Sequence, residues 1–102
     1  MLFVYTTTKD KESAEMLANE VIDLKLAARA NFWPVESIYY WEGVKETANH
    51  FMVMFTTHND EAHDLESHII AKHSITVPMI ARTQVDMVNE AYQLWVNETL
   101  GM

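Results

Sequence analysis

The sequence contains no cysteine, which excludes disulfide bonds, thiolate metal sites and cysteine nucleophiles. Only two glycines occur among 102 residues, so no glycine-rich loop is present that could hold a phosphate group. None of the serines lies in a nucleophile-elbow motif. Nothing in the chain therefore carries the signature of an enzyme, and we expect a protein without catalytic activity.

Basic residues are also few, because seven Lys and Arg stand against fifteen Asp and Glu, for a net charge of −8. An acidic surface repels a phosphate backbone, so we do not expect nucleic acid as a partner. No apolar run approaches the roughly 18–20 residues that a membrane helix needs. The apolar start at residues 1–5 is too short for a signal peptide. We therefore expect a cytoplasmic protein that does not bind membranes.

What the chain does have is a large hydrophobic fraction, 49% of its residues, which is enough for the core of one domain over residues 1–102. Hydrophobic periodicity predicts the order β-α-β-β-α-β followed by a C-terminal helix. This order is the α+β, ferredoxin-like arrangement, in which two helices cover one face of a four-stranded antiparallel sheet. The predicted strands are 2–7, 28–41, 51–57 and an extended segment 74–85, and the predicted helices are 10–25, 57–72 and 89–99.

Two local features refine this prediction. Pro34 cannot donate a ladder hydrogen bond, so it marks a bulge or an edge position in the second strand. The polar run from Glu42 to Asn49 predicts a connection longer than a tight two-residue hairpin turn.

The first and third strands are apolar on both faces. Leu2 and Val4 oppose Phe3 and Tyr5, and the third strand alternates Phe and Val with Met52 and Met54. Two helices can cover only one face of a sheet, and the other face would then expose a large apolar patch. We therefore expect the second face to pack against other subunits in an obligate oligomer.

The segment from Trp33 to Gly43 is the most distinctive in the chain, with four Trp and Tyr side chains in nine residues. Its string Ser37-Ile38-Tyr39-Tyr40-Trp41-Glu42-Gly43, after Leu26-Ala27-Ala28 and Asn31, resembles the signature of the CutA divalent-cation tolerance family. The later segments His73, Val77-Pro78 and Tyr92-Gln93-Leu94-Trp95 follow in the order of the same pattern. The resemblance thus extends through nearly the whole chain.

The resemblance implies a compact homotrimer of ferredoxin-like subunits, similar in architecture to the PII signalling proteins, which bind small effectors between subunits. It also implies a cytoplasmic role in tolerance of divalent metals, copper in particular. The implied site lies between subunits. Its candidate residues are Arg29, Tyr39, Trp41 and Thr56 for a small ligand, and His73 for copper or another divalent cation.

Several polar positions depart from the family pattern. Arg29 stands where the family commonly has cysteine, so a cation replaces a soft copper ligand. Thr56 stands where a lysine is usual, and the segment from His73 to Met79 keeps the histidine and second proline but lacks a tyrosine and two glutamates. The metal site is therefore expected to be incomplete, while Arg29 would suit a carboxylate or phosphate ligand.

Other candidate ligands have a simpler structural interpretation. Asp64 and His68 share a helix face at i and i+4, where a weak divalent site competes with an ordinary solvated face. Met52, Met54 and Met79 could offer thioethers to copper(I), although methionine on a buried strand usually serves packing.

Three hypotheses follow from the sequence. The preferred one is a CutA-like homotrimeric binding or regulatory protein, in which an anionic effector remains an alternative to metal. The second is a cofactor-independent α+β barrel enzyme, which would be a dimer with an open cavity above its sheet. The third is a structural trimer whose ancestral site has been lost.

Overall fold

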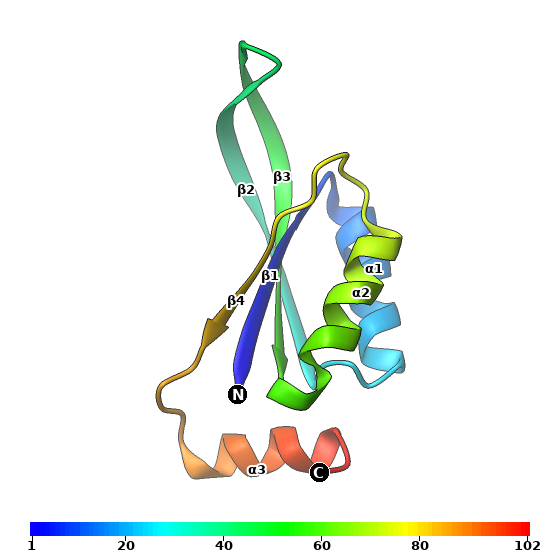
Figure 1. Cartoon of the computed structure of the whole chain (residues 1–102), viewed down its shortest axis with the longest axis vertical. Helices are drawn as coiled ribbons and strands as arrows, with labels where there is room; N and C mark the ends of the chain where they lie inside the picture. The colour runs from blue at the N-terminus through cyan, green and yellow to red at the C-terminus, as the bar shows by residue number, and fades with distance from the viewer.

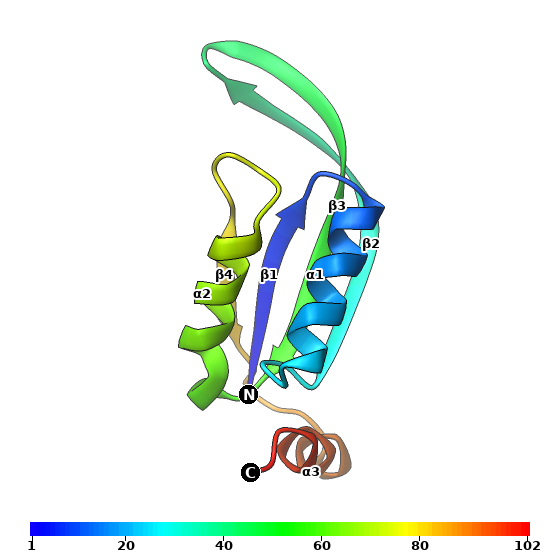
Figure 2. The same ribbon diagram turned by 90° about the vertical axis from the view of Figure 1, so that its right-hand side faces the viewer.

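The computed structural model describes residues 1–102 and shows the predicted order of elements (Figure 1). The four strands form one antiparallel sheet in the order β2-β3-β1-β4. Helices α1 and α2 lie on the same face of this sheet (Figure 2). The α+β, ferredoxin-like prediction is therefore confirmed. The elements are β1 (Leu2–Thr8), α1 (Lys11–Asp23), β2 (Arg29–Trp41), β3 (Val44–Thr57), the short 3-10 helix η1 (Asn59–Glu61), α2 (Ala62–Lys72), β4 (Ile80–Gln84) and α3 (Glu90–Thr99).

The hydrophobic core lies between the sheet and helices α1 and α2. Burial alternates along β1, so that Leu2, Val4 and Thr6 are buried under the helices while Phe3 and Tyr5 are only half-buried. Phe55, on β3, is fully buried on the helix side. Each helix buries an apolar stripe at helical spacing, which comprises Ala14, Leu17, Ala18 and Val21 from α1 and Ala62, Leu65 and Ile69 from α2.

The ends of α1 follow from its capping residues. The Asp10 carboxylate accepts a hydrogen bond from the backbone N–H of Ser13 at 2.8 Å, which identifies Asp10 as the N-cap. This hydrogen bond holds the pKa of Asp10 below its ordinary value. The helix ends at Asp23, and Lys25 takes a left-handed conformation (φ 56°). Leu24 falls within the predicted helix 10–25 at the spacing of the buried stripe, but it lies past the observed helix end and is exposed.

The predicted long turn between the second and third strands is wrong. Strand β3 begins at Val44, and only Glu42 and Gly43 connect it to β2. Both connecting residues have positive φ (50° and 78°), as a two-residue type I′ hairpin turn requires. Strand β2 lies at the edge of the sheet, which is one of the two positions that Pro34 predicted. The other, a bulge, is absent, because Pro34 pairs with Phe51 in an unbroken register.

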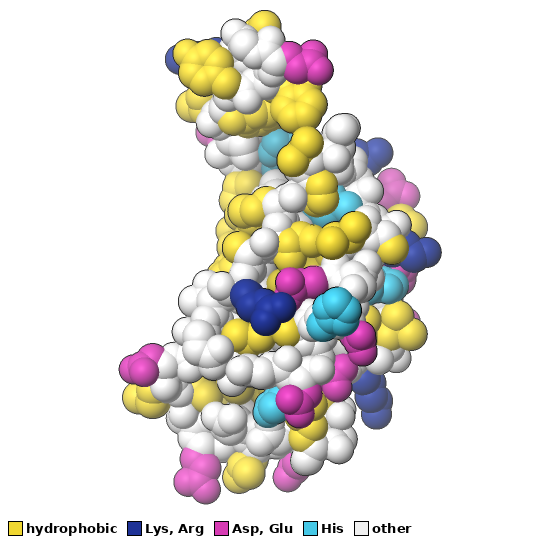
Figure 3. Space-filling view, in the orientation of Figure 1, with side chains coloured by type: hydrophobic (Ala, Val, Ile, Leu, Met, Phe, Trp, Pro, Cys, Tyr) yellow, Lys and Arg dark blue, Asp and Glu magenta, His cyan; other side chains and the backbone are white.

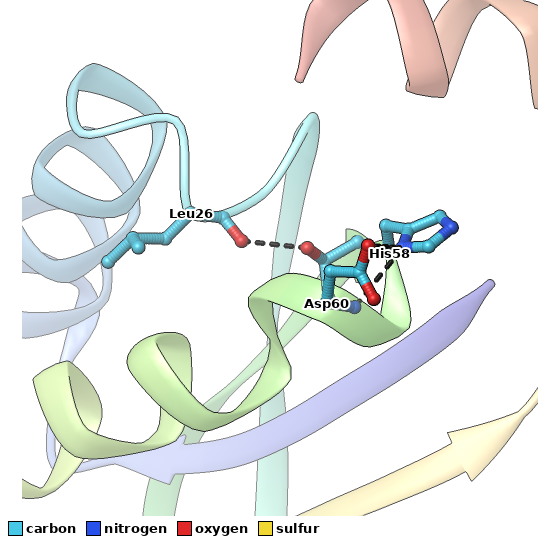
Figure 4. Close-up of polar contacts among 4 residues, drawn as sticks. Leu26, His58 and Asp60 are labelled. Carbon is cyan, nitrogen blue, oxygen red and sulfur yellow. Dashed lines mark hydrogen bonds and ion pairs between the residues drawn. The ribbon is translucent and has the colours of Figure 1, made fainter. Parts of the chain in front are cut away.

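The connection into the second helix differs in detail from the prediction. The predicted helix over residues 57–72 is divided into η1 and α2, and the His58 imidazole accepts a hydrogen bond from the Asp60 N–H at 3.1 Å (Figure 4). The Thr57 hydroxyl donates to the Leu26 carbonyl at 2.7 Å, which ties the end of β3 to the segment after α1.

The predicted extended segment 74–85 is strand only over β4, from Ile80 to Gln84. Residues 74–79 form a loop instead. Continuing the β1–β4 register would place Pro78 opposite Thr8, where proline has no N–H to donate to the ladder.

The β2–β3 hairpin extends well beyond the helices as an arm (Figure 1), and the molecule measures 46 × 25 × 21 Å. We call residues 36–49 the arm. Its apolar side chains are exposed on both faces of the hairpin, with Ile38 71% and Tyr40 75% exposed. Helix α3 lies across the opposite end of the molecule (Figure 1) and buries Val96. None of the three helices is long and apolar enough to span a membrane.

Candidate functional site

The sheet face opposite α1 and α2 is defined by the strand register. Cross-strand partners share a face, and the residues of β1 that alternate with the buried Leu2, Val4 and Thr6 point away from the helices. The partners of these residues on the neighbouring strands therefore point away from the helices as well. We call this set the open face. It comprises Phe3, Tyr5 and Thr7 of β1, Arg29, Asn31 and Trp33 of β2, and Met52, Met54 and Thr56 of β3.

Arg29 and Thr56 are direct cross-strand partners at one end of the open face. Arg29 is exposed and makes no ion pair. Thr56 is 1% exposed, and its hydroxyl has no hydrogen-bond partner. A guanidinium beside a buried, unpaired hydroxyl is an arrangement that can hold a small anion.

Tyr39 and Trp41 lie at the other end of the same strand, on the arm. Ten residues of extended strand separate Arg29 from Tyr39, which is about 33 Å. Within one chain the four predicted ligand-binding residues therefore form two separate pairs, Arg29 with Thr56 and Tyr39 with Trp41. A single site that uses both pairs would need more than one copy of the chain.

A groove of about 860 Å³ lies between the arm and the loop 74–79. Tyr39 and Trp41 line it, together with Ser37 and His50. The His50 Nδ1 atom lies 3.0 Å from the Ser37 Oγ atom, and the rings of His50 and Tyr39 stack with their centroids 6.1 Å apart. The arm thus holds the imidazole of His50 in a fixed orientation. Figure 3 shows hydrophobic and histidine side chains gathered where the arm meets the body of the molecule.

His73 directly follows α2 and lies on the helix-covered side of the sheet, close to Thr6 of β1. Its Nε2 atom is 2.7 Å from the Thr6 Oγ1 atom, and its Nδ1 atom accepts the Ile75 N–H at 3.0 Å. Because Nδ1 is the acceptor, the neutral ring carries its proton on Nε2 and donates it to Thr6. Burial lowers the pKa of His73 below its ordinary value, so the neutral form dominates at pH 7. A metal ion at His73 would have to displace one of these two hydrogen bonds.

The remaining candidates are dispersed. No group of three or more His, Cys, Asp or Glu side chains is placed to hold a metal ion. His68 pairs with Glu20 of α1 at 3.0 Å, rather than with Asp64 of its own helix.

Sequence reasoning did not identify the contact between Ser37 and His50. The missing signal was the two-residue turn at Glu42 and Gly43. That turn fixes the register and brings residue 50 opposite Val35, diagonally next to Ser37.

Comparison with known proteins identifies the family to which this fold belongs. Residues 2–99 match the family described as CutA1 divalent ion tolerance protein. The divalent-cation tolerance protein CutA of Pyrococcus horikoshii is 37% identical over 98 residues, which cover 96% of each chain. The protein of the same name from Archaeoglobus fulgidus is 31% identical over 98 residues, again covering 96% of each chain.

Solved structures agree with the sequence comparison. The crystal structure of CutA1 from Pyrococcus horikoshii has a TM-score of 0.94 at 35% identity and covers 97% of both chains. The structure of CutA from Archaeoglobus fulgidus, described as a periplasmic divalent cation tolerance protein, has a TM-score of 0.93 and covers 98% of this chain and 99% of the other. The chain therefore belongs to the CutA1 divalent ion tolerance family. Its relatives are named for tolerance of divalent cations and not for an enzymatic reaction.

Proposed function

We propose that this chain is a cytoplasmic, non-enzymatic binding or regulatory protein that acts as a homotrimer in tolerance of divalent metals, copper in particular. The names of its relatives support a role in divalent-cation tolerance. Cell fractionation tests the location, since one structural relative is described as periplasmic. Recovery of the protein in the periplasmic fraction would contradict that part of the proposal.

The observation that carries the proposal is the amount of apolar surface outside the core. The open face presents Phe3, Tyr5 and Trp33, and the arm presents Ile38 and Tyr40 on its other face. Apolar patches of this kind mark protein interfaces in soluble proteins. A second and a third copy are the proposed occupants, because a head-to-tail contact that closes as a ring covers the same two surfaces in every subunit.

A trimer also provides a reason for the two separated pairs of candidate residues. Arg29 and Thr56 lie about 33 Å from Tyr39 within one chain. In a ring of subunits, the arm of one copy can reach the body of the next. The proposed site is then formed by Tyr39 and Trp41 of one subunit with the segment from His73 to Met79, or Arg29 with Thr56, of its neighbour.

Isothermal titration calorimetry with copper(II) tests the metal role directly. The proposal predicts binding by the wild-type protein and loss of that binding in His73→Ala. The matched control is His63→Ala, because His63 is exposed on α2 and makes no hydrogen bond or ion pair with another side chain. Absence of copper(II) binding by the wild type would end the claim that His73 binds copper.

One observation favours a second ligand class, a small anion at Arg29. Arg29 has no carboxylate partner, and its neighbour Thr56 has a free, buried hydroxyl. If an anionic effector binds there, phosphate or citrate will raise the melting temperature of the wild type but not of Arg29→Gln. Lys45→Gln removes a comparable charge from the arm and should keep the wild-type shift, whereas equal shifts in all three proteins would refute the anion site.

A further inference from the structure

A single lone pair of the His73 ring holds the start of the loop 74–79. The His73 Nδ1 atom accepts the backbone N–H of Ile75 at 3.0 Å, and the Nε2 atom lies 2.7 Å from the hydroxyl of the fully buried Thr6. Because the neutral ring carries its proton on Nε2, the lone pair on Nδ1 is the one that a metal ion would use. The Ile75 N–H already occupies that lone pair.

The loop 74–79 has few other attachments to the rest of the chain. The Lys9 N–H donates to the Ser74 hydroxyl at 3.2 Å, at the first residue of the loop. Beyond Ser74, the bond from Ile75 to His73 is the only hydrogen bond of the loop, and the ladder between β4 and β1 begins directly after it. Segments with few hydrogen bonds open at a low cost in free energy. Loss of the bond to His73 would therefore free most of the loop.

The loop 74–79 also forms one wall of the groove of about 860 Å³ beside the arm. Tyr39 and Trp41 line this groove from the arm. The residues that line it from the loop are Ser74, Ile75, Thr76, Val77 and Met79. Because nearly every residue of the loop faces the groove, a displacement of the loop changes the shape of the groove.

A second cavity gives access to His73 from the helix-covered side of the sheet. It has a volume of about 220 Å³ and lies between α1 and the end of α2. His73 and Ser74 line it together with Glu20 and Lys72, so that one acidic and one basic side chain accompany the imidazole. Helices α1 and α2 lie opposite the open face (Figure 2). An ion that enters this cavity therefore reaches His73 without crossing the face that the proposed ring of subunits covers.

We infer that a metal ion and the loop 74–79 compete for the Nδ1 lone pair of His73, so that metal binding releases the loop and reshapes the groove. The Nε2–H group donates to Thr6, and a hydrogen bond from the second ring nitrogen is the support that most metal-binding histidines have. An ion at Nδ1 breaks the bond from Ile75 and leaves the bond to Thr6 intact. The inference rests on the proposed function, because it assigns the regulation of the same His73 site. By linkage, a groove ligand that needs the attached loop weakens metal binding by the same factor.

Calorimetric titration of the full chain with copper(II) tests the competition through two variants with opposite expected effects. Ile75→Pro removes the competing N–H, because proline has none, and should bind copper(II) about 2- to 10-fold more tightly than the wild type. Thr6→Val removes the hydroxyl that supports Nε2 and should bind about tenfold more weakly. A merely disturbed fold would weaken binding in both variants, and circular dichroism checks the fold. The control Met87→Pro, at an exposed residue between β4 and α3 whose N–H has no partner, should bind as the wild type does.

Amide hydrogen exchange, followed by mass spectrometry, provides a second readout. Saturating copper(II) should speed exchange across residues 75–79 of the wild type, and His73→Ala should show the fast exchange without metal. Copper(II) binding that depends on His73 but leaves loop exchange unchanged, with no gain in affinity in Ile75→Pro, would overturn the inference and sustain the proposed function. Binding by Ile75→Pro but not by the wild type would support the competition and end only the claim that the wild type binds copper(II) at His73. No binding by either protein would refute both.

Discussion

Replacing Ile38 and Tyr40 by serine should break up the proposed trimer without affecting the fold of the subunit directly. Both side chains lie on one face of the arm, and they are 71% and 75% exposed in the single chain. They contribute little to the core of their own subunit. Exposed substitutions away from special features change the stability of a fold by less than about 0.5 kcal/mol.

In a trimer that buries the arm, the same two residues have a large effect. Burying a side chain of this size contributes about 2 kcal/mol, so two residues contribute about 4 kcal/mol per subunit. Each residue occurs three times in the ring, and the free energy of trimer assembly would fall by about 12 kcal/mol. At 1.4 kcal/mol per factor of ten, this change raises the trimer dissociation constant by about eight to nine orders of magnitude.

Size-exclusion chromatography with light scattering, over a range of micromolar concentrations, measures the outcome. The arm variant should elute at a lower mass than the wild type, or unfold if the subunit requires the ring. The control is Leu24→Ser/Ile70→Ser, because these side chains are similarly exposed, 58% and 63%, but lie on the helix side. An arm variant with the same mass as the wild type would refute the reasoning.

Two further predictions concern the subunit itself. Glu42→Asn should stabilise the hairpin by about 0.5–1 kcal/mol, because Glu42 has a positive φ that asparagine tolerates better; an unchanged or lower midpoint in urea would contradict this. His73 has a pKa lowered by burial, so its contribution to stability is complete above its ordinary pKa of 6.5 and is lost as pH falls through the folded-state value. The difference in unfolding free energy between wild type and His73→Gln should therefore rise from pH 5 to 6.5 and then level off, and a difference that is flat in pH would contradict the assignment.

The sheet and its two covering helices could be predicted because burial imposes a period on the sequence. Leu2 and Val4 face the helices and alternate with Phe3 and Tyr5, while the stripe through Leu65 repeats at helical spacing. The arm could not be predicted in the same way. Its residues from Lys45 to Asn49 are polar on both faces because they extend beyond the core, so they resemble a loop.

The candidate site was predicted less completely than the fold. Arg29 and Thr56 are neighbours, as a shared site requires, but Tyr39 lies far along the strand from both. The contact between His50 and Ser37 depends on strand register, which a single turn residue can shift. Residue types alone therefore indicated candidate ligands, whereas their grouping required the three-dimensional register of the hairpin.

Sedimentation equilibrium of the wild-type protein at micromolar concentration tests the central claim most directly. The open face and the arm predict an oligomer, and the resemblance to the CutA family implies three chains, about 35 kDa from a subunit of 11.8 kDa. That mass should remain constant on dilution through the micromolar range. A stable monomer of 11.8 kDa across the same range would contradict the proposed assembly and any site formed between its subunits.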